Sequence, residues 1–169
     1  MTPPEEPAAA AYLERMRAVR HRLETHAGQG LPSGLTDPDP GATERWEAGQ
    51  VWAHLAEFPP YWARQIQIVV DGYRQSHSPV PFGRTKADAA RIAAIERDRH
   101  VDPAALLERV RGAIAEAADR LERLPAGAWE AVGRHPTRGE LPLSAIVEEF
   151  VVGHLEEHAD QLDLLRDRG

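Results

Sequence analysis

The sequence predicts an all-α protein, a four-helix bundle with long connecting loops. Four segments repeat apolar residues with the 3.6-residue period of helices that bury one face. Good helix formers such as alanine, leucine, arginine and glutamate are abundant, and 42% of all residues are hydrophobic, a normal fraction for a globular protein. Because four amphipathic helices can cover one another's apolar faces, we expect one bundle and a single domain over residues 1–169.

The first two predicted helices lie in the N-terminal half of the chain. The first is expected over about residues 5–27, and Gly28 is its predicted C-terminal stop. The second is expected over about residues 43–73, where Pro59 and Pro60 should bend or end it. Apolar stripes run along both, formed by Tyr12, Met16, Val19 and Leu23 in the first helix and by Trp46, Val51, Trp52, Leu55, Phe58 and Trp62 in the second.

The other two predicted helices lie in the C-terminal half. The third should begin at Asp102 and Pro103, since an aspartate cap followed by proline at the first helical position is a common helix start, and it should end before Pro125. The fourth should begin near Pro142 and continue almost to the C-terminus.

Three long connections separate these helices, at about residues 28–41, 76–101 and 126–141. Loops of this length are uncommon unless they have a function or structure of their own, and the segment KADAARIAAIERDR in the middle one is a candidate short helix. Long connections permit parallel as well as antiparallel neighbours, so the sequence leaves the topology open.

Composition excludes several classes of function. The formal net charge is -7 and no run of lysine or arginine forms a basic stripe, so we expect no nucleic-acid partner. The chain has no cysteine, which excludes disulfides, thiolate metal sites and a cysteine nucleophile. No apolar stretch approaches the ~20 residues that cross a bilayer, and the acidic start MTPPEEP is unlike a signal peptide. We therefore expect a cytoplasmic protein with no membrane partner.

The sharpest local signal is GHLEEHADQL, which places His154 and His158 four residues apart on the last predicted helix. This spacing turns the side chain by about 400°, so the two imidazoles lie one above the other on one face. Helical steps from the apolar residues Val147 and Val151 reach the same face, so both histidines should point inward. Two buried imidazoles need polar partners, and a shared metal ion would supply one for both.

The best third ligand is His54, in the apolar part of the second predicted helix. Three imidazoles and a water form a tetrahedral zinc site with one open position, the arrangement of catalytic zinc; nickel, iron, cobalt or copper also accept nitrogen ligands. The alternative is a set of neutral core histidines that hydrogen-bond to the backbone or to carboxylates. Neither a Glu-x-x-His ligand pair nor a His-Glu-x-x-His protease motif includes these histidines.

Each metal-binding histidine needs an acceptor for its second ring nitrogen. The polar residues nearby in the sequence are Glu57, Glu156, Glu157, Asp160 and Gln161. The remaining histidines fall near helix ends or in polar connections, and we expect all of them on the solvent-exposed surface: His21, His26, His77, His100 and His135.

Two segments, ERWEAGQVWAHLAEFPPYW and VVGHLEEHADQL, resemble the DinB/YfiT-like superfamily of metal-dependent enzymes, and the likeness extends over nearly the whole chain. The positions that match the family pattern are Trp46, His54, His154 and His158. The resemblance implies a four-helix bundle, a homodimer, and one divalent transition metal on the three histidines, with zinc or nickel as the metal that we expect.

The resemblance also implies an activity. Some members use mycothiol or bacillithiol, including bacillithiol S-transferases and the mycothiol-dependent maleylpyruvate isomerase, whose N-terminal domain is of this type. We expect no counterpart here of the isomerase's additional C-terminal domain, which counts against that particular reaction.

Our leading hypothesis is a metal-dependent enzyme that uses an external low-molecular-weight thiol for S-transfer to, or isomerisation of, small electrophiles. A bound metal can hold such a thiol as thiolate at neutral pH. Arg64 and Arg84 are candidates for binding a carboxylate of the thiol or substrate. The alternatives are a hydrolase that uses a metal-bound water, a non-catalytic metal-stabilised binding module, and a helical interaction protein.

Overall fold

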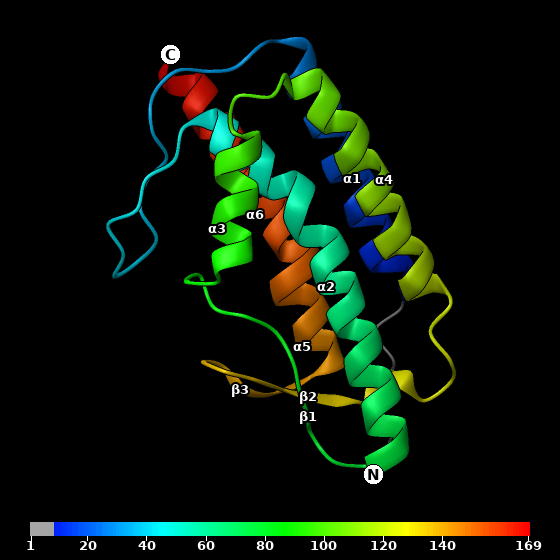
Figure 1. Cartoon of the computed structure of the whole chain (residues 1–169). Helices are drawn as coiled ribbons and strands as arrows, with labels where there is room; N and C mark the ends of the chain where they lie inside the picture. The colour runs from blue at the N-terminus through cyan, green and yellow to red at the C-terminus, as the bar shows by residue number, and fades with distance from the viewer. Residues whose placement is uncertain (1–8) are drawn as a thin grey trace.

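The all-α prediction is confirmed by the computed structural model, which describes residues 9–169 (Figure 1). The main helices are α1 (Ala9–Gly28), α2 (Ala48–Ser76), α3 (Ala89–Asp98), α4 (Pro103–Glu122), α5 (Leu143–Val147) and α6 (Gly153–Arg168). A π-helical turn, Glu148–Val152, joins α5 to α6, so these three segments together form the fourth long helix of the bundle. The predicted start of the first helix, residues 5–8, lies outside the described residues.

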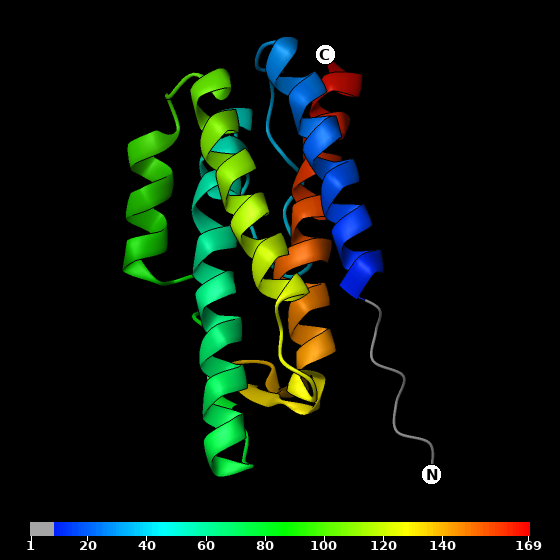
Figure 2. The same ribbon diagram turned by 90° about the vertical axis from the view of Figure 1, so that its right-hand side faces the viewer.

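The four long helices surround one hydrophobic core. α2 packs against α4 and α6, and α1 packs against the same two helices from the other side. Figure 2 shows α1 and α6 running in one direction while α2 and α4 run in the other, so α2 and α4 are parallel neighbours. The predicted short helix exists as α3, which packs on α2 and carries the chain back to the end of the bundle where α4 can start.

Local sequence explains where the helices begin. Asp102 caps α4 by accepting a hydrogen bond from the backbone N–H of Ala104, with Pro103 at the start of the helix as predicted. The helix α2 begins at Ala48, a few residues later than expected, because Glu47 and Gln50 form a capping box there.

Pro59 and Pro60 lie inside α2 and do not end it; the helix continues to Ser76, close to the predicted end at residue 73. A proline inside a helix removes one hydrogen bond and costs about 3 kcal/mol. The surrounding turns bury large apolar side chains, including Phe58 and Trp62, on the core face of α2. Burial of one such side chain contributes about 1.5–3 kcal/mol, so tertiary packing offsets the local cost.

The long connections contain a small sheet that the sequence did not predict. β2 (Val132–His135) pairs in parallel with β1 (Val80–Pro81) and antiparallel with β3 (Gly139–Pro142), in the order β1-β2-β3. Registered pairs include Val80 with Gly133 and Val132 with Pro142. The sheet lies at the end of the bundle where α5 begins (Figure 1), and it satisfies backbone groups that would otherwise lack partners.

Within residues 9–169, none of the helices combines the length and the apolar character that a bilayer crossing requires.

Candidate metal centre

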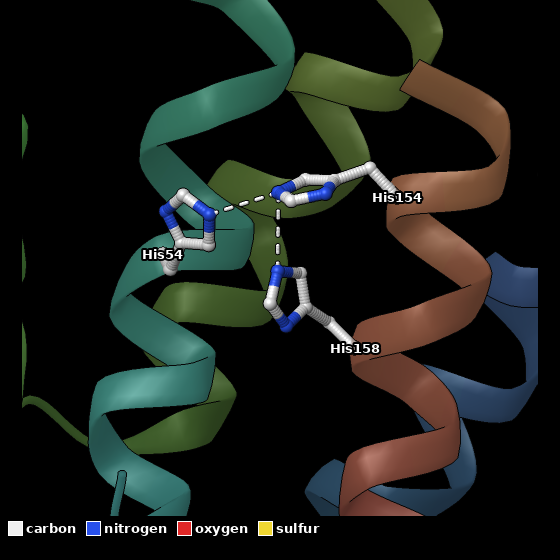
Figure 3. A group of neighbouring side chains, drawn as sticks. All are labelled: His54, His154 and His158. Carbon is white, nitrogen blue, oxygen red and sulfur yellow. Dashed lines mark hydrogen bonds between the residues drawn. The ribbon is translucent and has the colours of Figure 1, made fainter. Parts of the chain in front are cut away.

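The structure brings the three predicted histidines together from two helices. His54 projects from the first half of α2, and His154 and His158 project from α6 (Figure 3). The Nε2 atom of His154 lies 3.0 Å from Nε2 of His54 and 3.1 Å from Nε2 of His158. One ring nitrogen from each residue therefore lies within 4.8 Å of the other two, a spacing at which one metal ion can bind all of them.

The three rings differ in their exposure. His54 and His158 are buried, whereas His154 is half-buried. The indole ring of Trp46 stacks on His158 at a centroid distance of 5.9 Å, and Phe58 contacts His154 edge to face at 4.4 Å. Aromatic side chains thus pack against the imidazoles on one side. On the other side the half-buried His154 is reached by solvent.

Hydrogen bonds at Nδ1 set the tautomers of the two buried rings. Nδ1–H of His54 donates to Glu57 Oε1 at 2.8 Å, and Nδ1–H of His158 donates to Gln161 Oε1 at 2.8 Å. Nδ1 of His154 lies 3.6 Å from Glu157 Oε2. Three of the predicted acceptors therefore lie beside the three histidines, on the ring edge that faces away from the Nε2 cluster.

The other two predicted acceptors have a different role. Glu156 accepts hydrogen bonds from Arg15, and Asp160 accepts one from Arg22, so both carboxylates connect α6 to α1. Both residues lie on the face of α6 that is turned toward α1, and they do not contact the histidines.

The three Nε2 atoms carry too few protons to make a hydrogen bond in each of their two N···N contacts. A neutral imidazole carries one N–H, so His54 and His158, which donate through Nδ1, present unprotonated Nε2 atoms. His154 can donate a single Nε2–H to one of them, and the remaining N···N contact then lacks a proton. Nitrogen donors that converge in this way fit a divalent transition metal, which accepts all three lone pairs.

Electrostatics also favours neutral imidazoles. Burial lowers the pKa of His54 well below its ordinary value, and the neighbouring His158 and His154 lower it further. Burial, together with the charge of His154, lowers the pKa of His158 to about 3. Metal binding requires the neutral form of histidine, so the protein environment holds both side chains in the form that binds.

Glu57 has a second partner that fixes its carboxylate. Both of its oxygens accept hydrogen bonds from Arg84 Nη2, at 2.7 and 2.8 Å, and the guanidinium of Arg84 stacks on the ring of Tyr61 at 3.9 Å. Burial raises the pKa of Glu57, and the contact with Arg84 opposes that rise. The predicted carboxylate-binding residue Arg84 is thus already paired, and Arg64 is exposed and does not line the site.

The π-helical turn before α6 is a feature that sequence reasoning missed. It inserts extra backbone between the apolar residues of α5 and His154, and such turns occur often at functional sites. A Cβ at Gly153 would lie 2.6 Å from the carbonyl oxygen of Glu148, so only glycine fits directly before His154. No local sequence signal beyond this glycine marks the turn.

A cavity of about 460 Å³ opens beside the histidines. Its walls include His154 from the bundle and several residues of the long connections and the sheet, among them Thr36, Trp46, Arg84 and His135. This volume falls in the range of small-molecule sites, so the connections that the sequence left as loops form the walls of a binding cavity.

Two of the five remaining histidines are buried, and the prediction of their exposure is wrong. Nε2 of His26 lies 2.6 Å from Asp163 Oδ1 of α6. The ring of His135 stacks on Phe150 at a centroid distance of 4.9 Å, and its Nε2–H donates to the backbone oxygen of Arg84 at 3.0 Å. Partners from distant segments make this burial possible, and His135 also lines the cavity. Three histidines are exposed as expected, namely His21, His77 and His100.

Comparison with known proteins supports this description of the fold. The sequence pattern of the DinB superfamily matches residues 15–162. No curated protein matches the sequence. YfiT from Bacillus subtilis, described as a probable metal-dependent hydrolase with an unusual four-helix bundle topology, has a solved structure that is 19% identical with a TM-score of 0.71. The match covers 99% of this chain and 93% of YfiT.

Solved structures of a mycothiol-dependent maleylpyruvate isomerase are also similar. The isomerase and a histidine-to-alanine variant of it are 15% and 14% identical, with TM-scores of 0.63 and 0.64. Each match covers 96% of this chain but 63% of the isomerase chain. At these identities the likeness shows a shared four-helix fold.

Proposed function

The chain belongs to the DinB superfamily, and from that premise we propose that it is a metal-dependent enzyme that holds one divalent transition metal on His54, His154 and His158. We further propose zinc or nickel as the metal and a mycothiol- or bacillithiol-like thiol as the co-substrate. The reaction class is S-transfer to a small electrophile or its isomerisation.

One observation carries the metal assignment. Nε2 of His54 and Nε2 of His158 both face Nε2 of His154 at hydrogen-bond distance, while Glu57 and Gln161 occupy the opposite ring nitrogens. Core histidines that only pack would be expected to share protons with backbone or carboxylate acceptors on both ring nitrogens. A cluster in which two unprotonated ring nitrogens face a third is instead the arrangement that supports a metal ligand set.

The absence of cysteine from the chain bears on the thiol hypothesis. The sequence contains no cysteine, so a sulfur nucleophile must come from a second molecule, and the cavity beside His154 has room for one. When bound, the metal would stabilise the thiolate form of that molecule at neutral pH. The sulfur would form a bond to an electrophilic carbon; in transfer a leaving group departs with its electron pair, and in isomerisation the S–C bond breaks again.

Hydrolysis is the second candidate. The chain spans 93% of YfiT, described as a probable metal-dependent hydrolase, but 63% of the isomerase. The same three ligands with an open position would lower the pKa of a bound water to about 7, which provides a nucleophile without any thiol.

The test combines metal analysis with turnover of electrophiles. Wild type, a His154→Ala/His158→Ala variant and a matched His21→Ala/His100→Ala control are loaded with zinc or nickel, and metal content is measured by mass spectrometry. Each protein is then incubated with a panel of electrophiles, with and without mycothiol, bacillithiol and glutathione. We expect about one metal per chain and thiol-dependent turnover in wild type and control, and neither in the site variant.

Each alternative has its own outcome. Equal metal content in the site variant and wild type would contradict the ligand assignment. Turnover that is independent of thiol would favour the hydrolase, and bound metal without any turnover would favour a non-catalytic binding module.

A further inference from the structure

Arg91, in the first turn of α3, is a buried cation that faces the cavity. Its residue is 8% exposed, and it lines the cavity together with Trp46 and the histidines. Its guanidinium donates one hydrogen bond within the described residues, from Nη1 to the backbone oxygen of Lys86 at 3.0 Å. The guanidinium carbon also lies 5.3 Å from the ring centroid of Trp46. A guanidinium carries five N–H donors, so most of its donors are left for another partner.

Other cations of the cavity wall are already paired with carboxylates. These ion pairs are Arg84–Glu57, Lys86–Asp39 and Arg138–Glu149. Across residues 9–169, no carboxylate oxygen lies within ion-pair distance of the Arg91 guanidinium. Arg91 is therefore the exception in this wall.

A buried charge without a partner is unfavourable, which makes the isolation of Arg91 informative. Removing a guanidinium from water costs several kcal/mol unless an anion compensates it. Burial lowers the pKa of Arg91, and the carboxylates of Glu44 and Glu57 raise it from beyond ion-pair distance. The backbone N–H of Arg91, and not its side chain, bonds the carboxylate of Asp88. Arginine stays protonated at neutral pH, so the side chain offers its charge and its remaining donors to the cavity.

The position of Trp46 connects Arg91 to the histidine cluster. The same indole ring that contacts the Arg91 guanidinium stacks on His158 at an interplanar angle of 15°. One small molecule in the cavity would therefore meet the guanidinium and the histidines around a single aromatic ring. With Nη1 bonded to Lys86, the edge formed by Nε and Nη2 remains, and this fork matches the two oxygens of a carboxylate.

We propose that Arg91 binds the carboxylate of a small molecule that occupies this cavity, and that the physiological substrate or thiol carries such a carboxylate. The inference rests on the proposed function in placing a small molecule beside the histidines. Carboxylate binding by Arg91 itself requires no metal, so the two proposals can fail separately.

Direct binding tests the proposal. Succinate and benzoate, each compared with its neutral amide, are titrated into full-length wild type and variants, with and without zinc, by calorimetry and tryptophan fluorescence. The variants are Arg91→Gln, Arg91→Lys and the exposed control Arg64→Gln. We expect the carboxylates to bind at least tenfold more tightly than their amides, Arg91→Gln to lose this preference, Arg91→Lys to keep part of it, and Arg64→Gln to match wild type.

Several outcomes discriminate. If Arg91→Gln binds carboxylates as wild type does, or if amides bind as well as carboxylates, the proposal is overturned. Unfolding curves check that Arg91→Gln is folded. If it is not, Arg91→Lys takes its place, and carboxylate binding equal to that of wild type then overturns the proposal. If carboxylate binding persists in the His154→Ala/His158→Ala variant while metal is lost, Arg91 acts independently of the metal centre. In turnover assays, replacing the carboxylate of the electrophile or of the thiol by an amide shows which molecule Arg91 binds.

Discussion

Glu57 accepts a hydrogen bond from Nδ1–H of His54 at 2.8 Å, and both residues project from the same face of α2. The bond fixes the tautomer and the orientation of the imidazole, so that Nε2 is left free to face His154. The carboxylate is itself held by Arg84. The proposed metal ligand on α2, His54, is thus oriented by a residue one helical turn away.

We predict that Glu57→Gln lowers metal affinity about 10–100-fold, because a neutral amide orients His54 less well and makes its imidazole a weaker donor. Competition with a chromogenic chelator measures the affinity. Glu156→Gln is the matched control, since Glu156 lies on the site helix but bonds Arg15 instead of a histidine. Equal affinities for the two variants would argue that Glu57 does not orient a ligand.

Metal binding should stabilise the fold, because the proposed ligands come from α2 and α6 and converge only in the folded state. At a free metal concentration about 100-fold above Kd, the gain is about 2.7 kcal/mol. For a protein of this size, each kcal/mol of stabilisation raises Tm by about 2–4 °C. We expect a chelator to reverse the rise, His54→Ala to abolish it, and His21→Ala to retain it. A rise that survives in His54→Ala would place the metal elsewhere.

Much of the site could be predicted from the sequence because the signal is local. The four-residue spacing of His154 and His158, and the apolar seam that leads to them, fix their common face without knowledge of any other helix. His54 required only the assumption that its apolar helix face also points to the core. The three nitrogens then meet because the two helices pack against each other.

What the sequence could not predict depends on contacts between distant segments. The strand Val80–Pro81 has two residues, and its partner β2 lies some fifty residues further along the chain, so no periodicity marks it. His26 and His135 are polar residues in polar segments, and partners such as Asp163 and the backbone of Arg84 make their burial favourable. Arg91 looks like any arginine on an amphipathic helix until the carboxylates of the fold are seen to pair elsewhere.

Gly153 is predicted to be indispensable to the helix that carries His154. In Gly153→Ala the new Cβ would lie 2.6 Å from the carbonyl oxygen of Glu148, so backbone must shift, at a cost of about 1–3 kcal/mol. The control is Gly112→Ala in α4, where nothing lies within 4 Å and alanine should stabilise the helix by about 0.5–1 kcal/mol. Chemical denaturation measures both, and we also expect weaker metal binding in Gly153→Ala alone. A stabilised Gly153→Ala would show that the π-helical turn adapts freely.

Asp98, the last residue of α3, should stabilise the fold in a pH-dependent way. Hydrogen bonds from the Arg97 side chain hold its pKa below the ordinary value, burial opposes this, and Arg109 of α4 contributes a further hydrogen bond. The folded state therefore favours the ionised carboxylate. Its contribution to stability is complete above the unfolded pKa of about 3.9 and is lost as pH falls through the lower folded value.

We predict that Asp98→Asn costs about 1–2 kcal/mol at pH 7 and less at pH 3, measured by urea unfolding. The exposed Asp167→Asn should stay within about 0.5 kcal/mol of wild type at both pH values. Because Asp98 ties α3 to α4, a penalty for Asp98→Asn that is the same at pH 3 and pH 7 would mean that the ion pairs do not hold this helix, and with it Arg91, in place.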